Sequence, residues 1–207
     1  MNPVFIQKLS NRLKRNLPGK SVHETMFVRP RIPFPEINYD KKSIPASVLI
    51  LLFPKKDDWY FYLTKRTDMV NHHKGQVSLP GGMVENGESR KTAALRETNE
   101  EIGVSADQIQ LIGSLSPFYV PVSGFEMFPF VGWAASEPET SIHDKEVERI
   151  FSVSIKDFMA EENQKSKKDT LRGIPVIIPY FDLGGENVWG ATSIILSELK
   201  LLLREMQ

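Results

Sequence analysis

Apolar and polar residues follow one another along this chain in two patterns, one typical of strands and the other of helices. Residues 46–53 form an apolar run, which predicts a strand buried on both faces, and residues 59–64 predict its partner across a polar turn at 54–58. Similar patterns predict strands near 110–115 and 126–134. Together with the helices described below, these strands indicate an α/β sandwich whose mixed sheet carries helices on both faces.

Helical spacing of apolar residues recurs near both ends of the chain. Phe5, Leu9 and Leu13 repeat within the basic residues 1–16, and we expect this helix to dock on the domain. The alternatives are a mitochondrial presequence or a helix on a membrane surface. A last helix at about 191–205 is expected to pack on the sheet, because apolar residues repeat at Ile194, Ile195, Leu199, Leu202 and Leu203.

The stretches between these elements carry weaker signals. Four prolines within 29–45 predict an extended arm that wraps the core, and a proline-rich loop is predicted at 117–124. A short strand near 150–153 should lead into a brief helix at 155–159. Almost no apolar residue occurs from Glu161 to Lys168, which predicts an exposed hairpin tip or a mobile loop before the chain returns as a strand at 176–181.

Residues 81–104 combine turn, cap and carboxylate signals at close spacing. The Asn-Gly pair at 86–87 marks a turn, and Ser89 can cap the N-terminus of a following helix. Gly103 suits the left-handed residue just past the end of that helix. We therefore expect a helix from about Ser89 to Ile102.

One face of this helix is acidic and the other apolar. At about 100° per residue, a single narrow sector holds Glu97, Glu100 and Glu101. The roughly opposite sector, which should face the core, holds Leu95, Thr98 and Ile102. Like charges three or four positions apart each destabilise an isolated helix by about 0.2–0.5 kcal/mol, so the cluster favours either full solvation or a bound cation. Oxygen ligands without cysteine point to Mg²⁺ or Mn²⁺ rather than zinc.

Length and composition limit the remaining choices. The 207 residues suffice for one sizeable core, so we expect one domain with terminal additions. Lysine plus arginine equals aspartate plus glutamate at 26 each, so neither nucleic acid nor a membrane is an expected partner. The absence of cysteine excludes disulfides and thiolate chemistry and is compatible with the cytoplasm, the expected location. The chain has no apolar run of about 20 residues that would span a bilayer, and its first residues lack the hydrophobic core of a secretory signal.

Basic and protonatable residues precede the acidic segment. Arg66 and Lys74 lie close to it in sequence, and we favour them as partners for phosphate oxygens beside a metal; the alternative is a solvated loop. His72 and His73 are adjacent, so they do not share one face of a helix or strand, and a zinc pair is disfavoured.

The spacing of the acidic segment resembles the Nudix box, G-x5-E-x7-R-E-U-x-E-E-x-G-U, in which U is a bulky apolar residue. Every glycine and charged position of that pattern has its match in Gly82, Glu88, Arg96, Glu97, Glu100, Glu101 and Gly103. The departure is Thr98, whose methyl can still pack on the sheet while its hydroxyl bonds back to the preceding turn.

The flank from Leu63 to Gly82 resembles the signature of coenzyme A pyrophosphatase-like Nudix hydrolases, approximately L-L-T-x-R-[S/A], a short gap, then H-x-G-Q-x-x-F-P-G-G. Thr67 stands where that signature has a small residue and Leu79 where it has Phe. The resemblance covers roughly residues 17–200 and implies a Nudix-type α/β/α sandwich with a mixed sheet. We expect this domain to occupy 29–207, after an N-terminal helix and extension at 1–28.

The resemblance also implies an activity, namely Mg²⁺- or Mn²⁺-dependent hydrolysis of the pyrophosphate bond of coenzyme A or its derivatives. The products would be (acyl-)4′-phosphopantetheine and adenosine 3′,5′-bisphosphate. Two alternatives stay open. One is a Nudix enzyme for another small nucleotide, such as ADP-ribose, NADH or a dinucleoside polyphosphate, and the other is a non-catalytic ligand sensor on the same fold. A homodimer also stays open.

Roles follow residue by residue from this resemblance. Glu97 and Glu101 are expected to bind metal most directly. Glu100 would bind a second metal or activate water, while Glu88 supports the cluster or a further ion and the Gly81 carbonyl completes a shell.

The catalytic candidates are Glu100, Glu97 and Arg96, the last of which can orient a neighbouring carboxylate. The general base could instead be a loop carboxylate, Glu146 or Glu148. The substrate-binding candidates are Arg66, Lys74, Gly75, Gln76 and Gly82.

Overall fold

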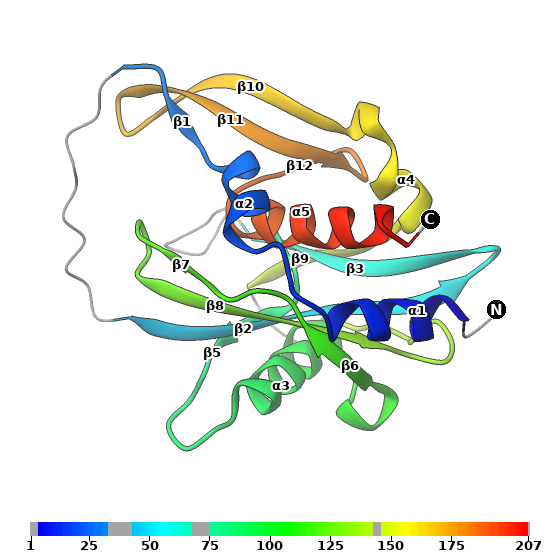
Figure 1. The fold of residues 1–207 in the computed structure, drawn as a ribbon. Coiled ribbons are helices and arrows are strands. Elements are labelled where there is room, and N and C mark those ends of the chain that lie inside the picture. The colour runs from blue at the N-terminus through cyan, green and yellow to red at the C-terminus, as the bar shows by residue number, and fades with distance from the viewer. Residues whose placement is uncertain (1–3, 33–42, 68–74, 143–145, 207) are drawn as a thin grey trace.

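A large mixed sheet forms the centre of the molecule in the computed structural model, which describes residues 4–32, 43–67, 75–142 and 146–206 (Figure 1). Within these residues the sheet has eight strands, ordered β4-β3-β2-β8-β6, with β5, β7 and β9 paired to β2, β8 and β3. The strands are β2 Ile44–Lys55, β3 Asp58–Arg66, β4 Val77–Ser78, β5 Gly81–Met83, β6 Gln110–Ser114, β7 Phe118–Val120, β8 Phe125–Trp133 and β9 Val147–Ser154.

Strand β2 lies at the middle of this sheet because its side chains are apolar on both faces. It pairs in parallel with β8 and antiparallel with β3, and its residues from Ala46 to Phe53 are all buried. The predicted strand is confirmed, but the turn is shorter than 54–58. Lys55 already pairs with Asp58, and the intervening Lys56 takes up a left-handed conformation with φ 53°.

A second, smaller antiparallel sheet corrects the expectation for residues 161–168. These residues form a short 3-10 turn (η3 Glu161–Asn163) and then β10, which pairs with β11 along its whole length. A strand at a sheet edge needs a backbone partner on one side only, so polar side chains such as Lys165 remain solvated. The strands of this sheet are β1 Arg29–Pro30, β10 Gln164–Leu171, β11 Ile174–Leu183 and β12 Glu186–Val188.

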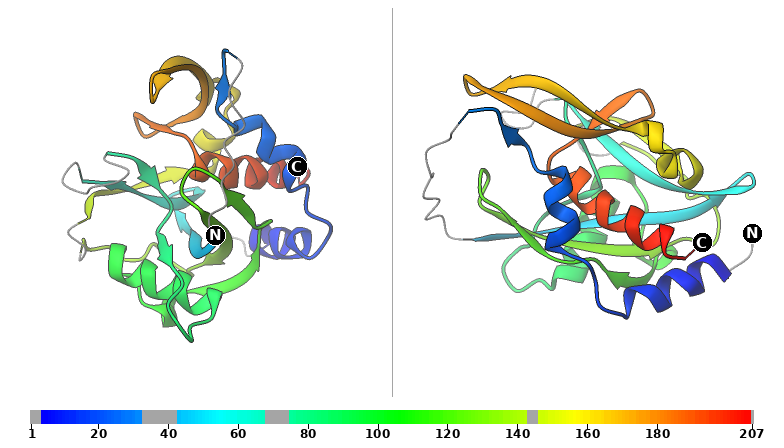
Figure 2. Two further views of the ribbon diagram at one scale, coloured as in Figure 1. Left: turned by 90° about the vertical axis from the view of Figure 1, so that its left-hand side faces the viewer. Right: turned by 45° about the horizontal axis from the view of Figure 1, so that its top comes forward.

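Helices cover both faces of the large sheet, as predicted, with α3 on one face and α5 and α1 on the other (Figures 1 and 2). The helices are α1 Val4–Leu13, α2 Lys20–His23, α3 Arg90–Ile102, α4 Ile155–Met159 and α5 Ala191–Arg204, with 3-10 turns at η1 Glu24–Met26 and η2 Ala106–Gln108. None of the described helices is both long and apolar enough to cross a membrane.

The N-terminal helix docks on the domain, which confirms that expectation. Leu9 and Leu13 of α1 are buried in the same apolar cluster as α5, and Phe5 stacks on Trp59 with ring centroids 5.3 Å apart. The predicted arm is described only in part. Its β1 residues Arg29–Pro30 pair with β11, whereas 33–42 lie outside the described residues.

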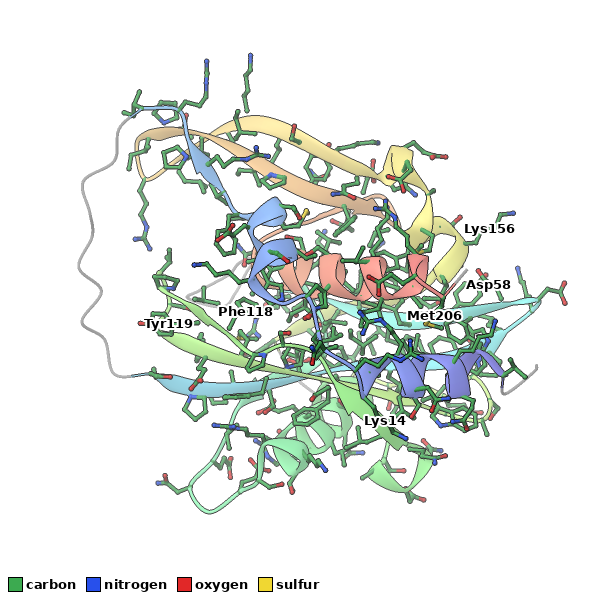
Figure 3. The ribbon with its side chains drawn as sticks, viewed as in Figure 1. Lys14, Asp58, Phe118, Tyr119, Lys156 and Met206 are labelled. Atoms are coloured by element: carbon green, nitrogen blue, oxygen red, sulfur yellow. The ribbon has the colours of Figure 1, made fainter. Side chains whose placement is uncertain are left out.

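The predicted loop at 117–124 contains one further short strand, β7, which pairs with β8 and was not expected. Its Phe118 packs against the ring of His23, with centroids 5.1 Å apart. At the opposite end of the sheet, the backbone N–H of Lys156 at the start of α4 donates to Asp58 in the β2–β3 hairpin, 2.9 Å away (Figure 3). Both ends of the large sheet are thereby joined to the α5 side of the molecule.

Candidate active site

The helix of the acidic segment begins and ends where its sequence signals predict. The Ser89 hydroxyl accepts a hydrogen bond from the Thr92 backbone N–H at 3.1 Å, which satisfies one of the unpaired donors of the first turn of α3. Gly103 closes the helix in the left-handed conformation, with φ 75°. These local contacts fix where the glutamates of α3 stand relative to the sheet.

Two consecutive glycines let β5 pass close beneath α3. A Cβ on Gly82 would lie 2.4 Å from the carboxyl carbon of Glu97, so the space that a side chain would need is taken by that carboxylate. Gly81 has φ 156°, and a Cβ there would lie 2.3 Å from the backbone oxygen of Ser47. The Gly81 N–H in turn points to Glu101, whose Oε2 lies 3.3 Å away.

Arg96 holds the cluster together. Its Nε and Nη2 donate to the two oxygens of Glu88, each over 3.0 Å, in the bidentate geometry that makes such pairs strong. Its Nη1 reaches Glu97 at 2.8 Å and Glu100 at 2.9 Å, and Nη2 also donates to the Met83 carbonyl at 3.0 Å. Arg96 thus hydrogen-bonds to three carboxylates and one backbone oxygen.

The pKa values of Glu88 and Glu97 are shifted in opposite directions. The hydrogen bond from Arg96 holds the pKa of Glu88 below its usual value. Burial raises the pKa of Glu97 above its usual value, and the Arg96 hydrogen bond only partly opposes this effect. The hydrogen bond to Glu88 also raises the pKa of Arg96, so the guanidinium keeps its charge.

The glutamates of the acidic face of α3 differ in exposure. Glu100 is half exposed, at 52% of its side chain, but Glu101 is 4% exposed and lies between α3 and β5. The Gly81 N–H donates to Glu101 and stabilises the buried carboxylate. The opposite face behaves as predicted. Thr98 is buried, and its hydroxyl donates back to the Ala94 carbonyl at 2.7 Å.

The ligand set fits a hard divalent ion by its chemistry. All four candidate side chains offer carboxylate oxygens, the ligands that Mg²⁺ and Mn²⁺ prefer. In the described part of the chain, however, no three His, Cys, Asp or Glu side chains already converge as a metal cage. Arg96 engages Glu88, Glu97 and Glu100 instead. A divalent ion at this cluster would therefore compete with Arg96 for these carboxylates.

Arg66 stands on β3 in contact with the segment that leads to β4. Its Nη2 bonds to Glu146, its backbone N–H donates to the Gln76 carbonyl at 3.0 Å, and its Nε is buried without a hydrogen-bond partner among the described residues. The structure therefore brings Arg66, Gln76 and one proposed base, Glu146, together. Gly75, just before Gln76, lies in a turn with φ 61°.

Lys74 and Glu148 are the remaining candidates of the flank and loop. Lys74, like His72 and His73, lies outside the described residues. Glu148 is exposed on β9, next to the segment that holds Glu146. Its part in the chemistry stays a prediction.

One charged group near the site was not anticipated from the sequence. Glu186 of β12 accepts hydrogen bonds on a single oxygen from Lys65 at 3.1 Å and from Arg149 at 3.0 Å. The two cations are register partners on β3 and β9, a pairing that exists only after the strands have assembled. No local motif in the sequence marks it.

An open hollow of about 500 Å³ lies elsewhere, beside β3 and β9. Its lining includes Lys55, Tyr62 and Glu137, the first and last of which form an ion pair at 2.6 Å. None of the predicted site residues lines this hollow. Helix α3 and strand β5, rather than the hollow, form the candidate active site.

Comparison with known proteins agrees with this geometry. A family model for the NUDIX domain matches residues 43–173, which include α3 and the two glycines of β5. Nudix hydrolase 15, mitochondrial, of Arabidopsis thaliana is 32% identical over 186 residues, which cover 86% of this chain and 65% of that protein. Nudix hydrolase 3 of Caenorhabditis elegans is 28% identical over 220 residues, 95% of this chain and 91% of that one. The chain thus spans just under two thirds of the length of the plant relative.

Solved structures show the same architecture. The crystal structure of RenU, a Nudix hydrolase from M. smegmatis, superposes with a TM-score of 0.57 over 81% of this chain and 90% of that one. The two sequences are 16% identical, so this likeness concerns the fold alone. It agrees with the predicted sandwich around a mixed sheet.

Proposed function

Because this chain belongs to the Nudix hydrolase family, we propose that it is a pyrophosphohydrolase that uses Mg²⁺ or Mn²⁺ and splits the pyrophosphate bond of coenzyme A or one of its derivatives. Hydrolysis would release (acyl-)4′-phosphopantetheine and adenosine 3′,5′-bisphosphate. The observation that carries the proposal is the set of four glutamates that Arg96 and the Gly81–Gly82 backbone hold together.

In this proposal each residue of the cluster has a separate task. Glu97 and Glu101 hold the ion, with Glu88, Glu100 and the Gly81 carbonyl as further ligands. When bound, the ion supplies Lewis-acid stabilisation of negative charge on the pyrophosphate and makes water more acidic. Arg96 keeps in place the carboxylates that stay bonded to it and touches neither ion nor substrate, so it is a positioning residue.

In this proposal an exposed carboxylate accepts the proton of the attacking water. Glu100 suits this task because half of its side chain is open to solvent while one oxygen is held by Arg96. Glu146 is the alternative, and its ion pair with Arg66 would have to open first.

The flank supports the choice of substrate. Arg66 offers a buried Nε–H that has no partner among the described residues, and a phosphate oxygen would satisfy this donor. Lys74, Gly75, Gln76 and Gly82 complete the expected binding set by their place in the signature of coenzyme A pyrophosphatase-like enzymes. Thr67 and Leu79 depart from that signature, so other nucleotide pyrophosphates must also be assayed as substrates.

A substrate panel with product identification tests the proposal. The full chain is incubated with Mg²⁺ or Mn²⁺ and, separately, with coenzyme A, acetyl-coenzyme A, ADP-ribose, NADH and diadenosine tetraphosphate. We expect coenzyme A or its acetyl form to have the highest kcat/KM, with phosphopantetheine among the products. A chelator should stop the reaction, and added Mg²⁺ should restore it.

The other outcomes separate the rival functions. A higher kcat/KM for another pyrophosphate would refute the coenzyme A assignment and retain the hydrolase. Binding of a nucleotide without turnover at any metal concentration would instead identify a ligand sensor.

A further inference from the structure

Ser47 is a buried polar side chain within an otherwise apolar stretch of β2. It is 0% exposed, and its hydroxyl has no hydrogen-bond partner among the described residues. Its neighbours along the strand, Ala46 and Val48, are also buried. A buried hydroxyl without a partner destabilises a fold, so an alanine would suit this position better unless the hydroxyl finds a partner in another state of the protein.

The hydroxyl faces the acidic helix. Side chains alternate along a strand, and Leu49, Leu51 and Phe53 share one apolar cluster with Ala94 of α3. Ser47 belongs to the same alternating set, so it points toward α3 rather than toward α5.

Its partner in the sheet places Ser47 beside Glu97. Ser47 pairs directly with Gly82 of β5, and side chains of paired residues project from the same face. A Cβ on Gly82 would lie 2.4 Å from the Glu97 carboxyl carbon, which puts that carboxylate almost at the Cβ position. The Glu97 carboxylate therefore occupies the side-chain position next to Ser47 on the same face of the sheet.

The opposite neighbour offers no acceptor. Ser47 pairs on its other side with Phe128 of β8, whose ring is covered by Arg90 at 3.5 Å from the ring centroid. Of these two flanks, only the one with the Glu97 carboxylate provides an oxygen to which the hydroxyl can donate.

From this arrangement we propose that Ser47 is a positioning residue, whose hydroxyl donates a hydrogen bond to the Glu97 carboxylate when that carboxylate turns from Arg96 to a divalent ion. The inference rests on the proposed metal-dependent function. In the present arrangement Glu97 Oε1 accepts from Arg96 at 2.8 Å, and the Ser47 hydroxyl has no partner within the described part of the chain. The new hydrogen bond forms only in the metal-loaded arrangement, so Ser47 favours that arrangement over the metal-free one.

Ser47→Ala provides the test, with Mn²⁺ affinity as the first readout. Binding is measured on the full chain without substrate, from the electron paramagnetic resonance signal of free Mn²⁺. We expect the variant to bind Mn²⁺ about tenfold more weakly, the usual effect of removing a group that orients a metal ligand. Its metal-free midpoint of urea unfolding should be unchanged or higher, because the variant removes an unpaired buried hydroxyl.

Ser197→Ala is the matched control. Ser197 is also buried, but its hydroxyl donates to the Ile194 carbonyl within α5 at 2.7 Å. Its replacement should leave Mn²⁺ affinity unchanged and lower the unfolding midpoint slightly.

The outcomes distinguish this inference from the proposed function. Equal Mn²⁺ affinity in Ser47→Ala and the unaltered chain overturns the role of Ser47, while hydrolysis by the unaltered chain still supports the function. A lowered metal-free midpoint with equal affinity assigns Ser47 to packing and also overturns the inference. An unaltered chain that neither binds Mn²⁺ nor hydrolyses any pyrophosphate contradicts both proposals.

Discussion

Arg96 donates two parallel hydrogen bonds of 3.0 Å to the carboxylate of Glu88, eight residues earlier in the chain. This pair joins the turn before α3 to the middle of the helix. It also turns the remaining Nη1 toward Glu97 and Glu100, so a single guanidinium sets the positions of acids on both segments.

Arg96→Lys should therefore reduce hydrolysis although it keeps the charge. A lysine ammonium cannot reproduce the planar fork that bonds Glu88 twice and reaches two further acids. We expect kcat/KM to fall about 10- to 100-fold, as for other groups that orient metal ligands. Arg204→Lys, on the exposed side of α5, is the control and should keep full activity. Undiminished kcat/KM in Arg96→Lys would show that the fork is dispensable.

Glu97→Gln and Glu101→Gln should each remove most of the activity, because an amide is a weaker ligand for a hard cation than a carboxylate. Turnover is measured at several Mg²⁺ concentrations up to saturation. Glu162→Gln, an exposed acid in η3, should behave as the unaltered chain. If either active-site variant turned over normally at saturating Mg²⁺, its carboxylate would not be a required ligand.

Gly82→Ala tests the close contact between β5 and α3. The added Cβ would lie 2.4 Å from the Glu97 carboxyl carbon, so the carboxylate must move, and we expect a loss of activity of at least about tenfold. Gly87→Ala is an informative control. It introduces a residue at φ 80° with no atom within 4 Å, which should cost about 1 kcal/mol of stability and leave kcat/KM unchanged. Equal activity losses in the two variants would argue against a steric effect on Glu97.

A fourth prediction concerns stability in acid and the buried Glu198 of α5. Burial by itself would raise its pKa, but hydrogen bonds from His23, Ser116 and the Gly19 backbone outweigh that effect and lower the pKa below its usual value. Since the unfolded chain then takes up the proton at higher pH than the folded one, this stability is complete above the ordinary glutamate pKa. It is lost as the pH falls through the lowered folded value.

Glu198→Gln should accordingly destabilise the protein by about 2 kcal/mol near neutral pH, and the difference should shrink in acid. The measurement is the free energy of urea unfolding of both proteins from about pH 7 to about pH 3. Glu162→Gln again serves as control, because its side chain is exposed. A difference that stayed constant over this range would mean that the charge of Glu198 does not contribute.

The sequence predicted those features of the site that depend on local signals. The bounds of α3 followed from Ser89 and Gly103, and the spacing of Arg96 and Glu100 by four residues on one helix agrees with their ion pair. The burial of Glu101 did not follow, because it depends on how closely β5 approaches the helix. That the Ser47 hydroxyl is buried without a hydrogen-bond partner among the described residues could not be predicted either. The contacts of a serine in an apolar strand become clear only when its partner across the sheet is known.

The fold, too, was predicted where local sequence signals determine it and not where long-range contacts do. The central strands and the long helices were predicted because their apolar periodicity is strong. The residues of β10 were predicted as a hairpin tip or a loop because their side chains are mostly polar. They form a strand through backbone pairing with β11. The shared carboxylate of Glu186 likewise arises only when β12 reaches the paired cations of β3 and β9.

The hydrogen bonds around Glu198 set the smallest piece of this chain that can be expected to fold. The family match begins at residue 43, but Gly19 and His23 supply two of the donors that surround this buried carboxylate. A shortened chain starting at the family boundary would leave Glu198 short of partners and would uncover the apolar face of α5 that α1 protects. For expression or crystallisation, the segment from Val4 to Met26 should therefore be kept together with the domain on which it packs.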